Sequence, residues 1–292
     1  MDTLANREGF IWMDGQLINW ADAKVHVLTH TLHYGLGVFE GVRAYSTPEG
    51  TKIFRMNDHT DRLFESAKIL DLDIPFEKEK INEIIRQLTI KQDVDNGYIR
   101  PVAWRGSEQM AISAMNATTN IAIATWTWPS YFSPEKILEG IRLTKSNWVK
   151  PSPDSAPTNS KAAGLYMICS LSKHEAEKNG FDDALMLDYR GFIAEATGAN
   201  IFFVKNNKLY TPLPDCFLNG ITRKTVIDIA NKLRIEINEG HFKYDFLKNC
   251  EEVFLTGTAV EITPVISIDN FKFKVGDTTK LLLDEFNKIV RD

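Results

Sequence analysis

The most constraining feature of this chain is the apolar stretch ALMLDYRGFIAEATGANIFFV near its middle. Its two ends, residues 184–187 and 201–204, predict buried strands, and the glycines between them predict a turn and a bend. Glu195 lies between these strands among small and apolar residues, without a basic neighbour in the sequence. Burying a carboxylate costs free energy unless a cation pairs with it. The stretch therefore predicts a buried hairpin around one carboxylate that needs a cationic partner.

Lys161 lies upstream of this carboxylate, where a loop meets a helix expected over residues 162–178. Its neighbours are small, so a planar ligand could approach the amine closely. Desolvation favours the neutral amine of a lysine, which suits a nucleophile that later carries a proton. Alone, a lysine at such a place is more often an ordinary solvated residue. Together with Glu195, which could pair with a protonated pyridine nitrogen, Lys161 indicates pyridoxal phosphate chemistry.

Three further places could bind a phosphate group. Gly220 and Thr222 open an expected helix, whose N-terminus offers backbone N–H groups and a hydroxyl. Thr258 follows another glycine after an apolar strand, and Arg62 could bind an anion through two hydrogen bonds. Each place alone has a plain interpretation as a helix cap, a turn or a solvated side chain. Their occurrence in one chain with Lys161 favours a phosphate site.

Composition excludes several other classes of protein. The 292 residues fit one large or two medium domains, and a formal net charge of -5 argues against nucleic acid as a partner. The three cysteines are widely spaced, which indicates neither a disulfide framework nor a zinc site. The N-terminus lacks the pattern of a signal peptide, and no apolar run approaches the roughly 20 residues of a membrane span. We expect a cytoplasmic enzyme that does not bind membranes.

The order of expected elements indicates an α+β protein. Residues 98–104 and 120–128 predict strands, and helices are expected after Asn57 and over residues 77–91. A proline-containing break follows. It divides the chain into a small N-terminal α/β domain over residues 1–132, an interdomain loop over 133–140 and a larger C-terminal, cofactor-binding domain over 141–292.

With these residues in view, the chain resembles the branched-chain amino acid aminotransferases, which are fold-type IV pyridoxal-phosphate enzymes. The resemblance covers nearly the whole chain and implies the two-domain, D-amino acid aminotransferase-like fold with pseudo-barrel strands in the larger domain. Its motifs are YGLGVFEGVR at 34–43, YIRP at 98–101, the segments around Lys161 and Glu195, GITR at 220–223 and GTAVEITP at 257–264.

The resemblance implies a role for each residue around the cofactor, pyridoxal 5′-phosphate. Lys161 would be the catalytic residue, bonded to the cofactor at rest and carrying the proton during the reaction. Glu195 would pair with the pyridine nitrogen and keep it protonated. The remaining cofactor-binding residues would be Arg62, Ile221, Thr222 and Thr258 at the phosphate, Leu218 on one ring face and Tyr166 at the ring 3-oxygen.

It also implies that amino groups move from L-leucine, L-isoleucine or L-valine to 2-oxoglutarate, which gives L-glutamate. Backbone N–H groups of Thr258 and Ala259, with the Tyr98 hydroxyl, would bind the α-carboxylate. Arg100 and Tyr34 would meet the γ-carboxylate of glutamate, and Arg43 would act as a brace. Apolar walls would come from Phe39, Trp128, Tyr131 and Tyr166, although core or interface packing remains open for Trp128 and Tyr131.

The loop after Pro101 departs from the common pattern of these relatives. It carries Trp104, Arg105 and Glu108 where many relatives are more apolar and rich in glycine. Extra charge there could widen the substrate range, or it could form an inert ion pair. Because this loop tends to lie near a neighbouring subunit in the family, the resemblance implies at least a homodimer, with a hexamer possible.

Other functions remain to be weighed. His26, His30 and His33 have a spacing that imitates a metal site on a helix, but Gly35 breaks such a helix and no acidic residue or cysteine completes the set, so no metal is expected. A D-amino acid transaminase or an aminodeoxychorismate lyase would keep Lys161 and Glu195 while changing the residues that bind carboxylates. A protein that binds pyridoxal phosphate without catalysis is a further alternative, against which both intact residues argue.

Overall fold

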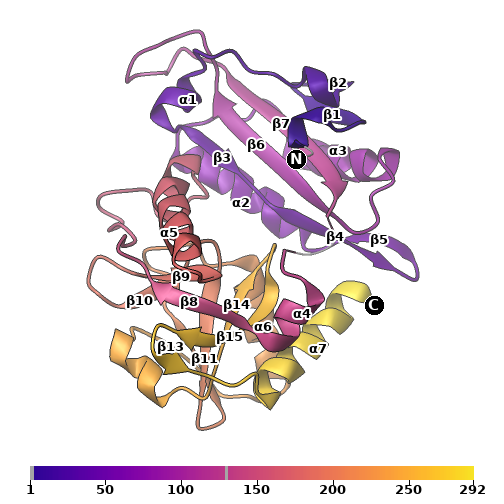
Figure 1. The fold of residues 1–292 in the computed structure, drawn as a ribbon. Coiled ribbons are helices and arrows are strands. Elements are labelled where there is room, and N and C mark those ends of the chain that lie inside the picture. Colours follow the sequence, from indigo (N-terminus) through magenta and orange to yellow (C-terminus); the bar gives the residue numbers. More distant parts are fainter. Residues whose placement is uncertain (1–2, 129–130) are drawn as a thin grey trace. The chain divides into compact units, whose positions relative to one another are not determined.

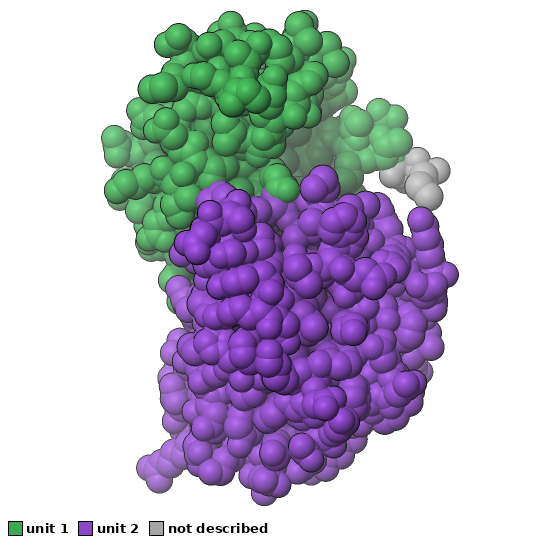
Figure 2. Space-filling view, turned by 90° about the vertical axis from the view of Figure 1, so that its left-hand side faces the viewer, with its two compact units in different colours: residues 1–129, 160–164 green, residues 130–159, 165–292 purple. Residues whose placement is uncertain are grey.

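The computed structural model describes residues 3–128 and 131–292 and divides into two compact units (Figures 1 and 2). Unit 1 consists of residues 1–129 with residues 160–164, and unit 2 consists of residues 130–159 with residues 165–292. The division therefore lies near residue 130, and the short segment that carries Lys161 belongs to the N-terminal unit.

The segment expected as an interdomain loop, residues 133–140, is instead largely helical and belongs to unit 2. Helix α4 covers Pro134–Glu139. The Ser133 hydroxyl accepts a hydrogen bond from the backbone N–H of Lys136, and a proline occupies the first turn, where its missing N–H is not needed. Serine and proline thus start a helix here rather than extend a loop.

Unit 1 is built on an antiparallel sheet with strand order β2-β1-β7-β6-β4-β5, and β3 pairs with β6. The first hairpin turns at Asp14 and Gly15, which both have positive φ, as a two-residue turn requires. The strands are β1 (Phe10–Met13), β2 (Gln16–Asn19), β3 (Gly37–Phe39), β4 (Val42–Thr47), β5 (Gly50–Ile53), β6 (Gly97–Arg105) and β7 (Thr119–Thr127).

Helices of unit 1 pack against this sheet and against one another. Helix α2 begins at Met56, so Asn57 lies inside it and is not the cap that the sequence predicts; Arg55 precedes the helix in a left-handed conformation. Leu63, Ala67 and Ile81 are buried between helices and sheet. The helices are α1 (His30–Tyr34), α2 (Met56–Ile69) and α3 (Lys78–Lys91), with 3-10 turns at Leu4–Asn6 and Trp20–Asp22.

Unit 2 contains a mixed sheet with strand order β10-β9-β8-β15-β14-β11-β12-β13, and β16 pairs with β15 (Figure 1). Strand β8 runs parallel to both of its neighbours, whereas the pairs on either side of β14 are antiparallel. The strands are β8 (Ile141–Lys145), β9 (Asp183–Leu187), β10 (Ile193–Ala196), β11 (Asn200–Lys205), β12 (Lys208–Pro212), β13 (Ile237–Gly240), β14 (Glu252–Gly257), β15 (Glu261–Ile268) and β16 (Phe271–Lys272).

Side chains from several of these strands form one apolar core in unit 2. Leu185, Ile201 and Leu255 are completely buried in it, which explains why the strands around Glu195 are almost uniformly apolar. Around the sheet lie α4, α5 (Tyr166–Lys178), α6 (Ile221–Lys232) and α7 (Asp277–Arg291), with 3-10 turns at Ala163–Leu165 and Tyr244–Asn249.

Both strands predicted around Glu195 are present, as β9 and β11, but the predicted hairpin between them is wrong, because β9 pairs with β8 and β10 and β11 pairs with β12 and β14. Glu195 does not lie in the connection but on a strand of its own, β10, which pairs antiparallel with β9. It stands opposite Met186, next to an irregularity in the register between Ile193 and Glu195. In the part of the chain that the structure describes, no helix combines the length and apolar character that crossing a bilayer requires.

Candidate functional site

In unit 1, backbone hydrogen bonds fasten Lys161 to the sheet. The N–H of Phe39 donates to the Lys161 carbonyl at 3.2 Å, and Val38 forms a bridge with Ala162. The Lys161 N–H donates to the Ser66 hydroxyl on α2 at 2.9 Å. Its ammonium lies 5.0 Å from the centroid of the Phe39 ring. Backbone contacts thus fix the position of Lys161 relative to the sheet and α2.

Close to this lysine, a buried cluster joins Glu40, His59 and Arg62. Arg62 donates from Nε and Nη2 to the two oxygens of Glu40, at 2.6 and 2.9 Å, and His59 Nδ1 donates to Glu40 at 2.7 Å. Burial alone would raise the pKa of Glu40, but the Arg62 guanidinium and His59 outweigh it and hold this pKa far below its usual range. Burial lowers the pKa of His59, and the positive charges of Arg62 and Lys161 add to that effect although Glu40 opposes it. Arg62, predicted to bind phosphate, is therefore held by an ionised Glu40.

Four of the predicted substrate-binding residues lie together in unit 1. The Arg100 guanidinium is 4.7 Å from the Phe39 ring centroid and 5.3 Å from that of Tyr98. Tyr98 meets Trp128 edge to face, with ring centroids 4.7 Å apart. Arg43, expected to be a brace, is buried and donates to the Trp128 carbonyl. The arrangement places the Arg100 cation among aromatic surfaces, which suits a site that accepts an apolar side chain or a carboxylate.

In unit 2, Glu195 has a cationic partner that the sequence did not reveal. Lys150 Nζ lies 2.8 Å from Glu195 Oε1, and each side chain is only 11% exposed. Lys150 also donates to the Cys169 thiol at 3.3 Å. Burial lowers the pKa of Lys150, but Glu195 and the other acidic groups around it outweigh this effect and raise that pKa above its ordinary value. Burial raises the pKa of the Cys169 thiol, so the cluster carries one ammonium and one carboxylate.

Asn200 connects this carboxylate to the beginning of α6. Its amide nitrogen donates to Glu195 Oε2 and to the Leu218 carbonyl, both at 3.0 Å. Its amide oxygen accepts from the Gly220 N–H at 3.1 Å. Asn200 is buried, so these bonds are shielded from water. One side chain therefore fixes the carboxylate relative to the N-terminus of a helix 12 residues long, where an anion is favoured.

A second group of polar atoms lies in unit 2 at the connection from β14 to β15. Thr258 and Ala259 form the turn there and are half-buried. The hydroxyl of Thr256, just before this turn, is buried without a hydrogen-bond partner among the described residues. Together with the buried Thr222 hydroxyl and the α6 terminus, these donors suit an anionic group, whereas Glu195 suits a protonated nitrogen. The residues of unit 2 therefore fit a ligand that carries both.

The remaining predicted residues lie elsewhere in the two units. Tyr34 is exposed on α1 and stacks on His30, with ring centroids 4.5 Å apart. Tyr131 belongs to unit 2, where it meets Phe132 edge to face. Tyr166 begins α5, and the half-buried Leu218 lies just before α6.

The charged residues of the atypical loop in unit 1 are engaged in local contacts. Arg105 is buried and donates to the carbonyls of Ala117 and Asp71. Glu108 accepts from the hydroxyl of Thr118. Arg105, which ends β6, and Glu108 thus form no ion pair with each other, and other groups engage both side chains.

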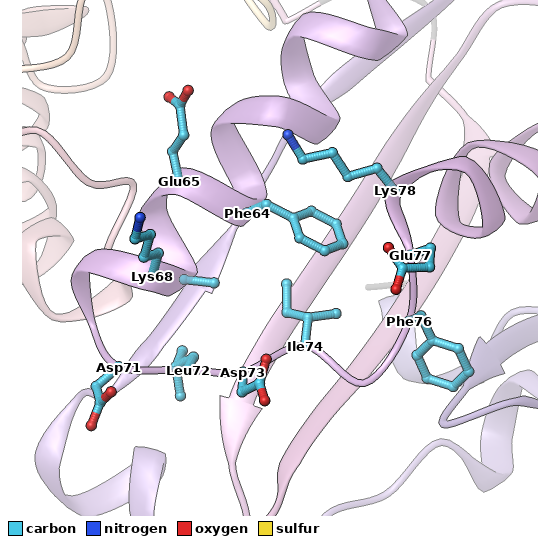
Figure 3. Close-up of a pocket in the computed structure, with 11 residues that line it drawn as sticks. Phe64, Glu65, Lys68, Asp71, Leu72, Asp73, Ile74, Phe76, Glu77 and Lys78 are labelled. Atoms are coloured by element: carbon cyan, nitrogen blue, oxygen red, sulfur yellow. The ribbon is translucent and has the colours of Figure 1, made fainter.

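A hollow of about 650 Å³ lies in unit 1 beside the end of α2 (Figure 3). Figure 3 shows Phe64 and Ile74 pointing into it, and none of the residues that line it is among the predicted site residues. Its charged lining is mainly acidic, which disfavours an anionic cofactor. The lining residues are Phe64, Glu65, Ala67, Lys68, Asp71, Leu72, Asp73, Ile74, Phe76, Glu77 and Lys78.

Sequence reasoning missed the residues that support the predicted ones. Asn200 carried a usable signal, because a polar residue that opens an apolar strand must find partners. The sequence signal at Lys150 and Glu40 is weaker, because the residues that pair with them lie far away in the sequence. Only pairing in three dimensions identifies them.

Comparison with known proteins places the chain in a family. The amino-transferase class IV family matches residues 37–268. The branched-chain-amino-acid aminotransferase of Pseudomonas aeruginosa is 42% identical over 274 residues, which make up 94% of this chain and 89% of that protein. The T.th. branched-chain amino acid aminotransferase complexed with N-(5′-phosphopyridoxyl)-L-glutamate has a TM-score of 0.93 at 36% identity, over 97% of this chain and 94% of that one. A complex of that protein with 4-methylvaleric acid has a TM-score of 0.92 with the same identity and coverage.

These similarities confirm the α+β, fold-type IV architecture and the resemblance that the sequence motifs indicate. They extend along nearly the whole chain and therefore include both units. The chain belongs to the amino-transferase class IV family.

Proposed function

We propose that this protein is a pyridoxal-phosphate-dependent transaminase that transfers the amino group of L-leucine, L-isoleucine or L-valine to 2-oxoglutarate. The similarity of the whole chain to branched-chain aminotransferases carries this proposal. The two ligands named for the T.th. enzyme, a phosphopyridoxyl-glutamate and 4-methylvaleric acid, correspond to the two kinds of substrate. One site then serves an apolar side chain in one half-reaction and a carboxylate in the other.

The similarity to these relatives implies the following residues for the cofactor site. Glu195 would pair with the pyridine nitrogen of pyridoxal phosphate, and Lys161 would hold the cofactor through its amine. Bound pyridoxal phosphate supplies an electron sink for the negative charge that develops at the substrate α-carbon. The other groups that hold the cofactor are Arg62, Ile221, Thr222 and Thr258 for the phosphate, Leu218 for a ring face and Tyr166 for the 3-oxygen.

The substrate is bound by its charged groups and positioned for proton transfer. The N–H groups of Thr258 and Ala259 and the Tyr98 hydroxyl hold the α-carboxylate, and the Lys161 amine removes the α-proton as a general base. Arg100 and Tyr34 bind the γ-carboxylate of glutamate. An apolar side chain instead lies against Phe39, Trp128 and Tyr131, which exclude water from the reacting carbon.

We further propose that the chain works as a homodimer or a larger homo-oligomer. Unit 1 exposes apolar side chains on two neighbouring segments, with Val27 70%, Leu32 61%, Ile112 82% and Met115 76% accessible. The N–H of His30 donates to the Gly106 carbonyl and ties the first segment to the base of the second. Apolar side chains exposed on neighbouring segments favour association with another protein surface.

The half-reactions of the purified, cofactor-loaded protein test this function. L-Leucine, L-isoleucine, L-valine and L-glutamate should each change the absorbance of the cofactor within seconds, whereas D-alanine should not. Borohydride reduction should label Lys161, and Lys161→Ala should lower the rate by roughly 10⁴-fold or more, because the general base and the nucleophile are lost together.

Lys68→Ala, at an exposed lysine on α2, is the matched control and should keep the parental rate. Rapid bleaching by D-alanine would instead identify a D-amino acid transaminase. A protein that stays colourless with pyridoxal phosphate, or is labelled at another lysine, would refute the assignment.

A further inference from the structure

Within unit 2, the carboxylate of Glu195 already has partners on both oxygens. Lys150 pairs with Oε1 at 2.8 Å, and Asn200 donates to Oε2 at 3.0 Å. A carboxylate oxygen can accept more than one hydrogen bond. Glu195 can therefore bind a further proton-bearing nitrogen while it keeps both protein partners.

The backbone sets the place of Lys150. Its N–H donates to the Leu187 carbonyl at 2.8 Å, and it forms a bridge with Asp188 at the end of β9. Glu195 pairs with Met186 on the same strand. The backbones of Lys150 and Glu195 are thus both paired with β9 or the residue after it, which makes their ion pair a feature of the sheet rather than of two mobile side chains.

We propose that Lys150 is a positioning residue that shares the Glu195 carboxylate with the pyridine nitrogen of the cofactor. It holds the carboxylate in place before the cofactor binds, and it competes with the pyridine nitrogen for the carboxylate afterwards. This inference rests on the proposed function, because it assigns the second cation to pyridoxal phosphate.

A competition between two cations follows from this arrangement. When Lys150 is present, its ammonium partly neutralises the Glu195 carboxylate. The ion pair between Glu195 and the pyridinium then contributes less to the free energy of cofactor binding. Without the ammonium, Glu195 lacks this ion-pair partner, and its pairing with the pyridinium contributes more to the free energy of cofactor binding. Loss of Lys150 should therefore make binding depend more strongly on the ring nitrogen, whereas a purely structural role would weaken all ligands alike.

The test compares two ligands of the apoprotein, pyridoxal phosphate and 1-deazapyridoxal phosphate, in which a C–H group replaces the ring nitrogen. The measured quantity is the dissociation constant of 1-deazapyridoxal phosphate divided by that of pyridoxal phosphate. Lys150→Met should raise this ratio about tenfold or more, since removing one charge next to a buried ion pair shifts a protonation equilibrium by about one pKa unit or more.

Two further variants separate charge from packing. Lys150→Arg keeps a cation and should give a ratio within about threefold of the parent, because a guanidinium can also pair with the carboxylate. Lys173→Met is the matched control in unit 2, since Lys173 is a mostly buried lysine on α5 whose ion pairs are with Glu177 and Asp183. It should leave the ratio unchanged.

If Lys150→Met folds poorly, the double variant with Glu195→Gln provides a second measurement. Removing both charges leaves no unpaired buried ion, so the apoprotein should recover most of the urea resistance that Lys150→Met loses. No recovery would show that Lys150 does not act through Glu195.

The outcomes also distinguish this inference from the proposed function. If the parent protein binds both ligands equally, or binds neither, the role of Glu195 in the proposed function is wrong. If the parent prefers pyridoxal phosphate and Glu195→Gln removes that preference, the function stands. An unchanged or lower ratio in Lys150→Met would then overturn the inference alone.

Discussion

At the scale of residues, each unit contains a buried carboxylate that forms an ion pair with a cation from a distant part of the sequence. Glu40 is completely buried and is paired with Arg62, and Glu195 is paired with Lys150. Removing one partner of such a pair leaves an uncompensated charge, which destabilises a protein by about 3–5 kcal/mol. Both pairs therefore make the protein sensitive to single substitutions.

The Glu40 cluster predicts how the stability of unit 1 depends on pH. The pKa of His59 is lowered from 6.5 in the native state, so its contribution is complete above pH 6.5 and is lost as the pH falls, because the unfolded chain then binds the proton more readily. The pKa of Glu40 is lowered from 4.5 and adds a second loss below that value. Urea unfolding at pH 7.5, 6, 5 and 4 should show a stepwise fall in the free energy of unfolding.

His59→Gln should flatten the first step, between pH 7 and 5, because it removes the group whose pKa burial lowers in the native state. His26→Gln, at an exposed histidine of the same unit, should not change the profile. If the free energy of unfolding of His59→Gln falls with pH as steeply as that of the parent protein, another group controls stability between pH 7 and 5.

At the scale of elements, local sequence determines where most of them occur, whereas their ends depend on contacts. Strands β6 and β7 lie where the sequence predicts them. Helix α2 begins before its predicted cap because Asn57 instead accepts a hydrogen bond from Asn82 of α3. Contacts of this kind have no local signature.

Gly220 provides a prediction at this scale. Its φ of -59° and ψ of 144° are open to any residue, but an added Cβ would overlap the amide oxygen of Asn200. Gly220→Ala should displace Asn200 and lower the stability of the apoprotein by about 1–3 kcal/mol, as overpacking of a core does. It should also weaken binding of pyridoxal phosphate, measured by titrating the apoprotein with cofactor.

Gly198→Ala is the control for apoprotein stability, because an added Cβ there meets no heavy atom within 4 Å. It should unfold at nearly the parental urea concentration. Equal stability of both variants would mean that Asn200 does not need its observed position.

At the scale of the whole molecule, the chain crosses between units more than once. Residues 160–164 belong to unit 1, although the segments before and after them belong to unit 2. The residues proposed to hold the cofactor are consequently spread over both units: Lys161 and Arg62 lie in unit 1, and Glu195 and Thr222 lie in unit 2. Loss of either unit should remove the activity completely.

The exposed apolar surface of unit 1 predicts self-association. Ile112→Glu should shift the protein toward smaller species in sedimentation velocity experiments at micromolar concentration, because burying a charge at an interface is unfavourable. Ile90→Glu is the matched control, since Ile90 is 78% exposed on α3, away from these two segments in the sequence. A monomeric parent protein, or equal effects of both variants, would contradict the proposed assembly surface.

The sequence by itself determined the α+β class, most strands and helices, and the family. Periodicity and glycine turns are local, and motifs such as Gly220-Ile221-Thr222-Arg223 keep their order along the chain. The same information singled out Lys161 and Glu195 as the pair around which the chemistry is organised.

Only the tertiary structure decided what accompanies those residues. It assigned Lys161 to the N-terminal unit, paired Glu195 with Lys150 and linked it through Asn200 to α6. The physical reason is that burial makes each charge and polar group seek a partner, and long-range packing rather than sequence distance determines which partner is near.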